Sequence, residues 1–194
     1  MPWIRDFGPE EGYRGILDVS RVWYLDDNRR LCAKVADKVK AEMRLFSRTL
    51  EKHWAGENIL PQSQPVMVEL KGKLPGDGEL LCIDLYDTDR HTVTICFDST
   101  NKEMTVNYNR ADRASRYGIR TVPCEMMEKE TDIDILIDGN TFTLLWEHGL
   151  YRYTGKLYPQ GNIGVDIKYR AKRIMILTSL GENIDLILTG KKES

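Results

Sequence analysis

Aromatic rings and charged side chains gather in two short segments of this sequence, residues 112–118 and 146–152. A flat aromatic face can stack on a planar apolar surface. Carboxylate and guanidinium groups form strong, directional hydrogen bonds. Together these groups have the chemistry to hold a ring that carries hydroxyl groups. The candidate binding residues are Asp112, Arg113, Tyr117, Trp146, Glu147 and Tyr151, with His148 and Arg152 beside them.

Each candidate also has a purely structural explanation. Trp146 continues an alternation of apolar residues that begins at Phe142, which favours core packing over ligand stacking. Tyr151 and Tyr153 share one face of a predicted strand and fit cross-strand packing partners. The loop 112–118 is the strongest candidate, because polar loops at the end of a β-sandwich commonly carry recognition.

A catalytic site has weaker support, and we predict no catalytic residue. Cys124 and His148 could be drawn as a nucleophile and its base, but no known local signature surrounds either residue. His148 fits a turn residue before Gly149 better. Five carboxylates close together in the sequence suggest a paired-acid site only by their number. A solvated loop followed by the outward face of a strand explains them more simply. These carboxylates are Glu125, Glu128, Glu130, Asp132 and Asp134.

The cysteines give no metal signature. Cys32, Cys82, Cys96 and Cys124 are widely spaced, with no Cys-x-x-Cys pair and no histidine at zinc-finger spacing. We therefore expect no metal and no cofactor, and reduced thiols. Cys82 and Cys96 lie inside apolar strand patterns and are predicted to be small core residues.

Composition limits the class of protein and partner. The chain has 194 residues, 41% hydrophobic and 30% charged, with a formal net charge of -2, which suits one globular domain. Nucleic acid is disfavoured as a partner because no basic surplus exists. No apolar run approaches the roughly 20 residues that span a bilayer, and the N-terminus has no apolar signal core. We expect a soluble, cytoplasmic protein without a membrane partner, unless the chain was excised from a longer precursor.

Alternating apolar residues predict short strands from Pro65 onward, each bounded by Asp, Gly, Asn or Ser. Such strands at a spacing of roughly 8 to 12 residues predict an all-β fold, an antiparallel two-sheet β-sandwich of the jelly-roll or concanavalin-like kind. The basic cluster Lys168, Arg170, Lys172 and Arg173 is predicted to be a solvated strand end or turn. The predicted strands are 66–70, 81–85, 93–97, 104–108, 133–137, 142–146, 174–177 and 184–188.

The first third of the chain has a different pattern. A β-rich run to Leu25, a charged turn over residues 26–30 and a short strand from Leu31 predict a hairpin. Apolar residues then recur every three to four positions, which predicts one N-terminal amphipathic helix over about 35–54, with a break near Arg44. The apolar residues of this pattern are Val35, Val39, Met43, Phe46 and Leu50.

Two runs together resemble a known family. Asp138-Gly139, Glu147-His148-Gly149 and Tyr158-Pro159 separate strands in an order that resembles the C-terminal β-sandwich of glycoside hydrolase family 32, which includes invertases, levanases and inulinases. The run 12–31 is similar to the passage from propeller to sandwich in that family. The resemblance implies a linker from an absent propeller over 1–14, a β-sandwich domain over 15–190 and a tail over 191–194.

The family's hydrolytic motifs are absent from this sequence. The resemblance implies a carboxylate nucleophile in Trp-x-Asn-Asp-Pro-Asn-Gly, an acid in Glu-Cys and an Arg-Asp-Pro helper, arranged for a retaining mechanism. None occurs here: Arg5-Asp6 is followed by Phe7, and Cys124-Glu125 has the reverse order. The resemblance therefore implies a non-catalytic module that supports a propeller.

The resemblance leaves an alternative open, since related sandwich modules bind the terminal fructose of a fructan. A free-standing fructan- or fructoside-binding module is therefore the second hypothesis, and a further copy of this chain is another candidate partner. Thr143 stands where the family usually has Glu. Either Arg110 or Arg113 matches the arginine of the family's Asp-Arg-Ser.

Overall fold

The computed structural model describes residues 3–5, 15–17, 20–49, 53–55, 65–73, 76, 78–111, 117–124 and 130–171. Its elements in chain order are β1 (Trp3–Arg5), β2 (Gly15–Leu17), β3 (Arg21–Leu25), β4 (Leu31–Val35), α1 (Asp37–Glu42), β5 (Arg44–Thr49), β6 (His53–Ala55), β7 (Val66–Lys73), β8 (Glu79–Tyr86), β9 (Thr92–Asp98), β10 (Glu103–Arg110), β11 (Ile119–Pro123), β12 (Glu130–Asp138), β13 (Thr141–Trp146), β14 (Tyr151–Lys156) and β15 (Gly164–Ala171).

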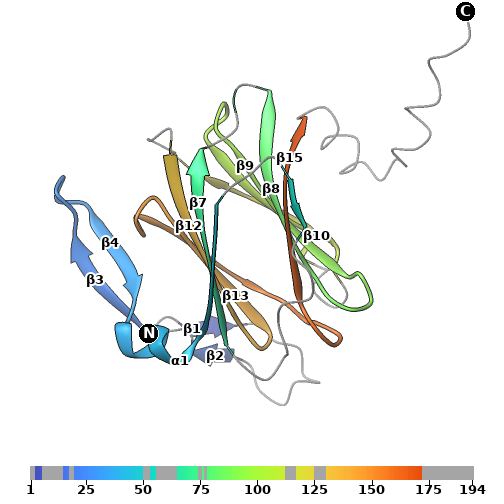
Figure 1. Ribbon diagram of the computed structural model, residues 1–194, viewed down its shortest axis with the longest axis horizontal. Coiled ribbons are helices and arrows are strands. Elements are labelled where there is room, and N and C mark those ends of the chain that lie inside the picture. The colour runs from blue at the N-terminus through green and yellow to red at the C-terminus, as the bar shows by residue number, and fades with distance from the viewer. Residues whose placement is uncertain are drawn as a thin grey trace, which may run out of the picture.

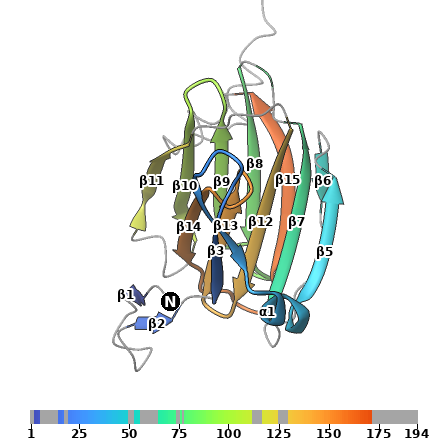
Figure 2. The same cartoon turned by 90° about the vertical axis from the view of Figure 1, so that its left-hand side faces the viewer.

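Two large sheets face each other and form the sandwich (Figures 1 and 2). One sheet has six strands in the order β11-β10-β9-β8-β15-β6, and the other has five in the order β14-β13-β12-β7-β5. The pairs β1–β2 and β3–β4 form two small sheets. Strand pairing is antiparallel in the described part of the chain except between β5 and β7. The predicted mostly antiparallel β-sandwich with one helix is confirmed.

The core lies between the two sheets because strand residues alternate between faces. Ile133, Ile135 and Ile137 of β12 point inward and are fully or almost fully buried. Across the core, Phe97 of the six-stranded sheet meets Trp146 of the five-stranded sheet edge to face, with 5.7 Å between ring centroids. The alternation that predicted β7, β8, β9, β10, β12 and β13 therefore also identifies their buried face. The edge strand β11 was not predicted.

The helix predicted over about 35–54 is wrong in length. Among the described residues of this span, only α1 is helical, and β5 then pairs with β7 in a parallel ladder from Arg44↔Val66 to Thr49↔Lys71. Val39 and Met43 do pack against an apolar cluster on the outer face of the five-stranded sheet, which explains the helical spacing at its start. Beyond it, the open backbone edge of β7 offers hydrogen bonds that outweigh a weak helical preference.

The predicted N-terminal hairpin is present as β3 and β4, and it lies against the five-stranded sheet. The backbone N–H of Ala33 donates to the carbonyl of Gly149 at 2.9 Å. Arg21 Nη2 donates to Thr154 Oγ1 of β14 at 3.4 Å. Figure 1 shows the hairpin projecting at one side of the sandwich. These contacts fix its base on the domain.

The basic cluster, predicted to be a solvated strand end or turn, is described for Lys168 and Arg170 only, and Arg170 lies next to the last residue of β15. Both residues lie within β15, which pairs with β8 on one side and with β6 on the other. Their side chains occupy the outer face of the six-stranded sheet, where they pair with Asp84 of β8. Val165 and Ile167 occupy the core face of the same strand. Alternating charged residues therefore marked the outer face of a central strand.

The proposed domain boundaries stay predictions. Trp3–Arg5, inside the expected linker, pairs with Gly15–Leu17. Asp112 and Arg113, the predicted strands 174–177 and 184–188, and the expected tail lie outside the described residues. Within the described part of the chain, no helix is long and apolar enough to span a membrane.

Candidate carbohydrate site

Trp146 is a core residue. Only 1% of it is exposed, and its ring stacks on Tyr151 at 5.6 Å with 16° between the ring planes. Its indole Nε1–H donates to Cys124 Sγ at 2.9 Å. The core packing preferred for Trp146 in the sequence is therefore confirmed, and its ring faces protein groups. Tyr151 is half-buried against it and joins the same core.

Glu147 and His148 form the turn between β13 and β14 with left-handed backbone, at φ 51° and 54°. Glu147 is buried, and its carboxylate accepts a hydrogen bond from Thr131 Oγ1 at 3.1 Å. The exposed His148 ring lies with Nδ1 3.2 Å from Asp132 Oδ2. Asp132 Oδ1 also accepts the backbone N–H of His148 at 3.0 Å. Asp132 and Thr131 therefore hold this turn in a conformation that non-glycine residues seldom adopt.

The structure gives Cys124 and His148 separate surroundings. Cys124 is buried, and burial raises the pKa of its thiol to about 11, although the Trp146 indole N–H lowers it. The thiol therefore stays protonated near neutral pH, where a thiolate nucleophile is required. His148 pairs instead with Asp132 on the surface. These contacts give no support to Cys124 as a nucleophile with His148 as its base.

Tyr117 belongs to a cluster of tyrosines at the other end of β14. Its hydroxyl accepts a hydrogen bond from Lys156 Nζ at 2.9 Å, and its ring meets Tyr108 edge to face at 5.8 Å. Tyr108 and Tyr153 share a hydrogen bond of 3.0 Å between their hydroxyls. Lys156 is 8% exposed, an unusual burial for an ammonium group. Sequence reasoning missed Lys156, because its contact with Tyr117 spans 39 positions.

The candidate residues that the structure describes do not form one site, and Asp112 and Arg113 lie outside the described residues. Tyr151 and Lys156 mark opposite ends of β14, which are roughly 16 Å apart at the ordinary rise of a strand. Trp146 and Glu147 lie at the Tyr151 end, while Tyr117 lies at the Lys156 end. A single sugar ring cannot contact both groups.

Arg152 takes part in a surface pair that the sequence did not reveal. Its guanidinium carbon lies 4.5 Å from the ring centroid of Trp23 on β3. Thr143, at the position where the resembling family usually has Glu, shares a 3.1 Å hydrogen bond with Thr154. Arg152 therefore connects β14 to β3 of the hairpin. Thr154 connects β14 both to β13, through Thr143, and to β3, through Arg21.

The acidic cluster is partly as predicted. Asp134 of β12 lies opposite Glu69 of β7, outside the core, and Lys40 of α1 forms an ion pair with Glu69. Burial, followed by the charges of Glu69 and Asp132, raises the pKa of Asp134 to about 6. Glu69 and Lys40 were missed, because neither stands near Asp134 in sequence. No group of three or more potential ligands is placed to hold a metal among the described residues.

Sequence comparison identifies no relative of this chain. No protein-family model matches it, and no curated protein matches it.

Solved structures, in contrast, share its fold. A family 32 β-fructofuranosidase of Bombyx mori superposes with a TM-score of 0.55 at 16% identity, over 84% of this chain and 32% of that chain. An exo-inulinase of Aspergillus awamori gives 0.59 at 12% identity, over 82% and 36%. Fructan 1-exohydrolase IIa of Cichorium intybus gives 0.57 at 14%, over 82% and 41%. The chain thus spans about a third of the length of these enzymes, and the resemblance expected from the sequence is confirmed for the fold.

Proposed function

We propose that this chain is a non-catalytic β-sandwich module of a family 32 β-fructosidase, which flanks and stabilises a catalytic propeller outside these 194 residues. The observation that carries the proposal is the difference in length: 84% of this chain corresponds to only 32% of the Bombyx mori enzyme. The remainder of such an enzyme would hold the propeller and its two carboxylic acids. The sequence of this chain contains none of the motifs that supply them.

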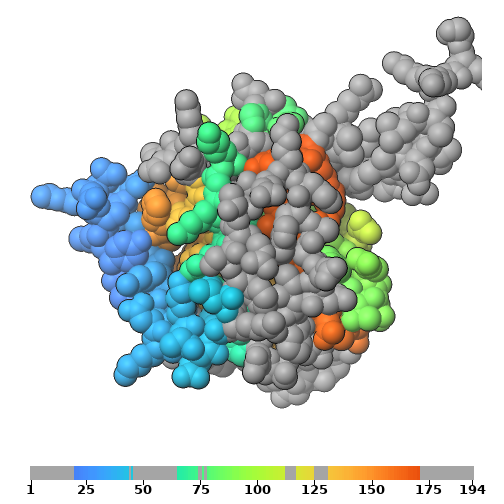
Figure 3. Space-filling view, viewed as in Figure 1, coloured from blue at the N-terminus to red at the C-terminus, as the bar shows by residue number. Residues whose placement is uncertain are grey.

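The tip of the β3–β4 hairpin supplies apolar surface for such a partner. Leu25 and Leu31 are register partners at this tip and are 64% and 58% exposed. Figure 3 shows the hairpin, in blue, along one edge of the molecule. Grouped exposed apolar side chains are typical of protein contacts. We assign this tip to the propeller, because it lies within the segment that resembles the passage between the two domains.

The hairpin contact can be tested with the polypeptide that is encoded immediately upstream of Met1. We expect the two chains to co-elute in size-exclusion chromatography after coexpression. Leu25→Asp with Leu31→Asp should weaken the complex at least tenfold, because both charges would be buried at the contact. The matched control is Leu45→Asp, which changes an exposed leucine on β5 and should leave the complex intact. Equal loss with the control would contradict this assignment.

A free-standing fructan-binding module is the competing role, and the separation of Tyr117 from Trp146, Glu147 and Tyr151 favours the support role over it. Calorimetric titration of the purified chain with levan, inulin and sucrose distinguishes the two roles. The support role predicts no binding heat at millimolar sugar. A saturable heat with any of the three would favour the binding module instead.

A further inference from the structure

Two cysteines lie directly opposite each other on the outer face of the six-stranded sheet. Cys82 of β8 and Cys96 of β9 are register partners in the antiparallel pairing of the two central strands. Their sulfur atoms are 2.7 Å apart, and with Leu80 they form a small buried cluster separate from the main core. All four cysteines of the chain are free thiols in the structure. We propose that Cys82 and Cys96 form a reversible cross-strand disulfide, a modification site independent of the proposed function.

The backbone is already suitable for this bond. Directly opposed residues of antiparallel strands have Cα atoms about 4.5 or 5.5 Å apart, and disulfides span Cα separations of about 4.4 to 6.8 Å. The sulfur atoms need to approach by only about 0.6 Å to reach the covalent length near 2.05 Å. A small rotation of the two side chains supplies this movement, so β8 and β9 can keep their register.

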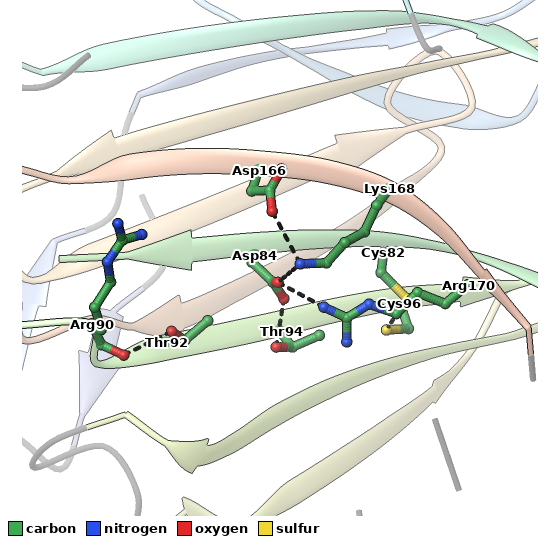
Figure 4. Close-up of polar contacts among 9 residues, drawn as sticks. All are labelled: Cys82, Asp84, Arg90, Thr92, Thr94, Cys96, Asp166, Lys168 and Arg170. Carbon is green, nitrogen blue, oxygen red and sulfur yellow. Dashed lines mark hydrogen bonds and ion pairs between the residues drawn. The ribbon is translucent and has the colours of Figure 1, made fainter. Parts of the chain in front are cut away.

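Charged residues of β15 lie beside the thiols. Figure 4 shows Arg170 between the cysteines and Asp84, whose carboxylate its Nη2 reaches at 3.0 Å. The hydrogen bond with Cys82 and burial raise the pKa of the Cys96 thiol, and the Arg170 charge lowers it. The buried Cys96 thiol is therefore seldom a thiolate, and it reacts slowly while the sheet is closed. The same burial would protect the disulfide from reduction once it has formed.

The oxidant we name is a low-molecular-weight disulfide. One cysteine, as thiolate, attacks a sulfur of the reagent, which forms a mixed disulfide and releases one small thiolate. The second cysteine then attacks the protein sulfur of that mixed disulfide and releases the second small thiolate. The two protein thiols lose two electrons and two protons, and the reagent gains them as two small thiols. The product links β8 to β9 and closes a loop from Cys82 to Cys96, which contains the turn between Tyr86 and Thr92.

The test is incubation of the purified folded chain with oxidised glutathione, followed by alkylation, digestion and mass spectrometry. We expect a linked peptide pair that contains Cys82 and Cys96 and lacks two hydrogen atoms, with Cys32 and Cys124 alkylated. The melting temperature of the oxidised chain should rise by several degrees, about 3 °C or more, because the cross-link restricts the unfolded chain. A reducing agent should reverse both changes.

Cys32→Ser is the matched control, since it removes a buried cysteine outside the pair and should leave the link intact. Cys96→Ser should abolish the link and leave Cys82 as a glutathione adduct or a free thiol. The proposal is overturned if wild-type Cys82 and Cys96 are both alkylated after prolonged oxidation, or if the linked peptides join other cysteines. A higher temperature that is still below the melting temperature should speed the reaction, because the sheet then opens locally more often.

Discussion

Gly149 connects the β13–β14 turn to the hairpin, and its lack of a side chain is required. Its φ is +81°, and a Cβ atom placed there would lie 1.8 Å from the carbonyl oxygen of Ala33. Gly149→Ala should therefore lower the free energy of unfolding by about 3 kcal/mol, measured by urea denaturation. Gly139→Ala is the matched control, because Gly139 also has positive φ, +52°, but open space around it. We expect a loss of only about 1 kcal/mol there; equal losses would show that the contact has no role.

Asp134 makes stability depend on pH. The pKa of its carboxyl is about 6 in the folded chain, against an ordinary value of 3.8. Between these values the folded state keeps a proton that the unfolded state has released, so the free energy of unfolding falls as pH rises. Asp134→Asn removes the charge and should stabilise the protein by about 1 kcal/mol near pH 8, with little effect near pH 3. The measurement is urea denaturation at both pH values.

Four charged groups act on the pKa of Asp134, so none of them is substituted in the two variants that are compared. They are Glu69 and Lys71 of β7, Asp132 on its own strand and Lys40 of α1. Asp138→Asn, an exposed change at the end of β12, is the control and should shift stability by less than about 0.5 kcal/mol at either pH. A stabilisation by Asp134→Asn that is the same at both pH values would contradict the raised pKa.

Local alternation identified the burial of single residues but not their partners. It placed Trp146 in the core because parity along β13 is a local property. It could not reveal the hydrogen bond from Lys156 to Tyr117 or the stacking of the Arg152 guanidinium on the Trp23 ring. Both contacts depend on how segments distant in the sequence are arranged. The expected sugar site stays a prediction: the described candidates Trp146, Glu147 and Tyr151 lie at one end of β14 and Tyr117 at the other, while Asp112 and Arg113 lie outside the described residues.

At the scale of elements, one buried carboxylate joins three strands of the six-stranded sheet. Asp84 of β8 accepts a hydrogen bond from Thr94 of β9 at 2.6 Å and pairs with Lys168 and Arg170 of β15 (Figure 4). Asp84→Asn should lower the free energy of unfolding by about 3 kcal/mol, because two partly buried cations would lose their shared partner. Thermal and urea denaturation measure the loss.

Asp89→Asn provides the comparison for Asp84→Asn. Asp89 lies in the exposed turn between β8 and β9, so the same chemical change there should cost less than about 0.5 kcal/mol. Similar values for the two variants would mean that the Asp84 ion pairs contribute little net stability, as happens when solvent screens them.

Strands whose apolar residues alternate could be predicted from the sequence. Strands that depend on pairing with a distant strand could not. The six strands predicted between 66 and 146 match their apolar alternation, and the turn residues Asp138-Gly139 end β12. The mostly exposed β11 has no such alternation and was not predicted. The segment of β5 was predicted to be helical because Val39 and Met43 have helical spacing, whereas pairing with the free edge of β7 makes Arg44–Thr49 a strand. β15 was not predicted, because its basic residues are typical of a solvated strand end or turn, although Val165 and Ile167 alternate with them.

For the whole molecule, the sequence was enough to predict the fold. The function that we propose depends in addition on a partner, the catalytic propeller. Pairs of packed sheets with a filled core serve many unrelated functions, so the fold alone specifies none. The described residues supply a firm core, a hairpin with an exposed leucine pair and two separated groups of candidate residues. These features are the ones on which our proposal of a supporting module rests.

The most direct measurement of this role is fructose release from sucrose and inulin by three samples. They are this chain alone, the polypeptide encoded immediately upstream alone, and the two coexpressed. Our account predicts no release by this chain alone, and release by the coexpressed pair that persists to higher temperature than release by the upstream polypeptide alone. Fructose release by this chain alone would contradict it, and so would an upstream polypeptide without the family's two catalytic carboxylates.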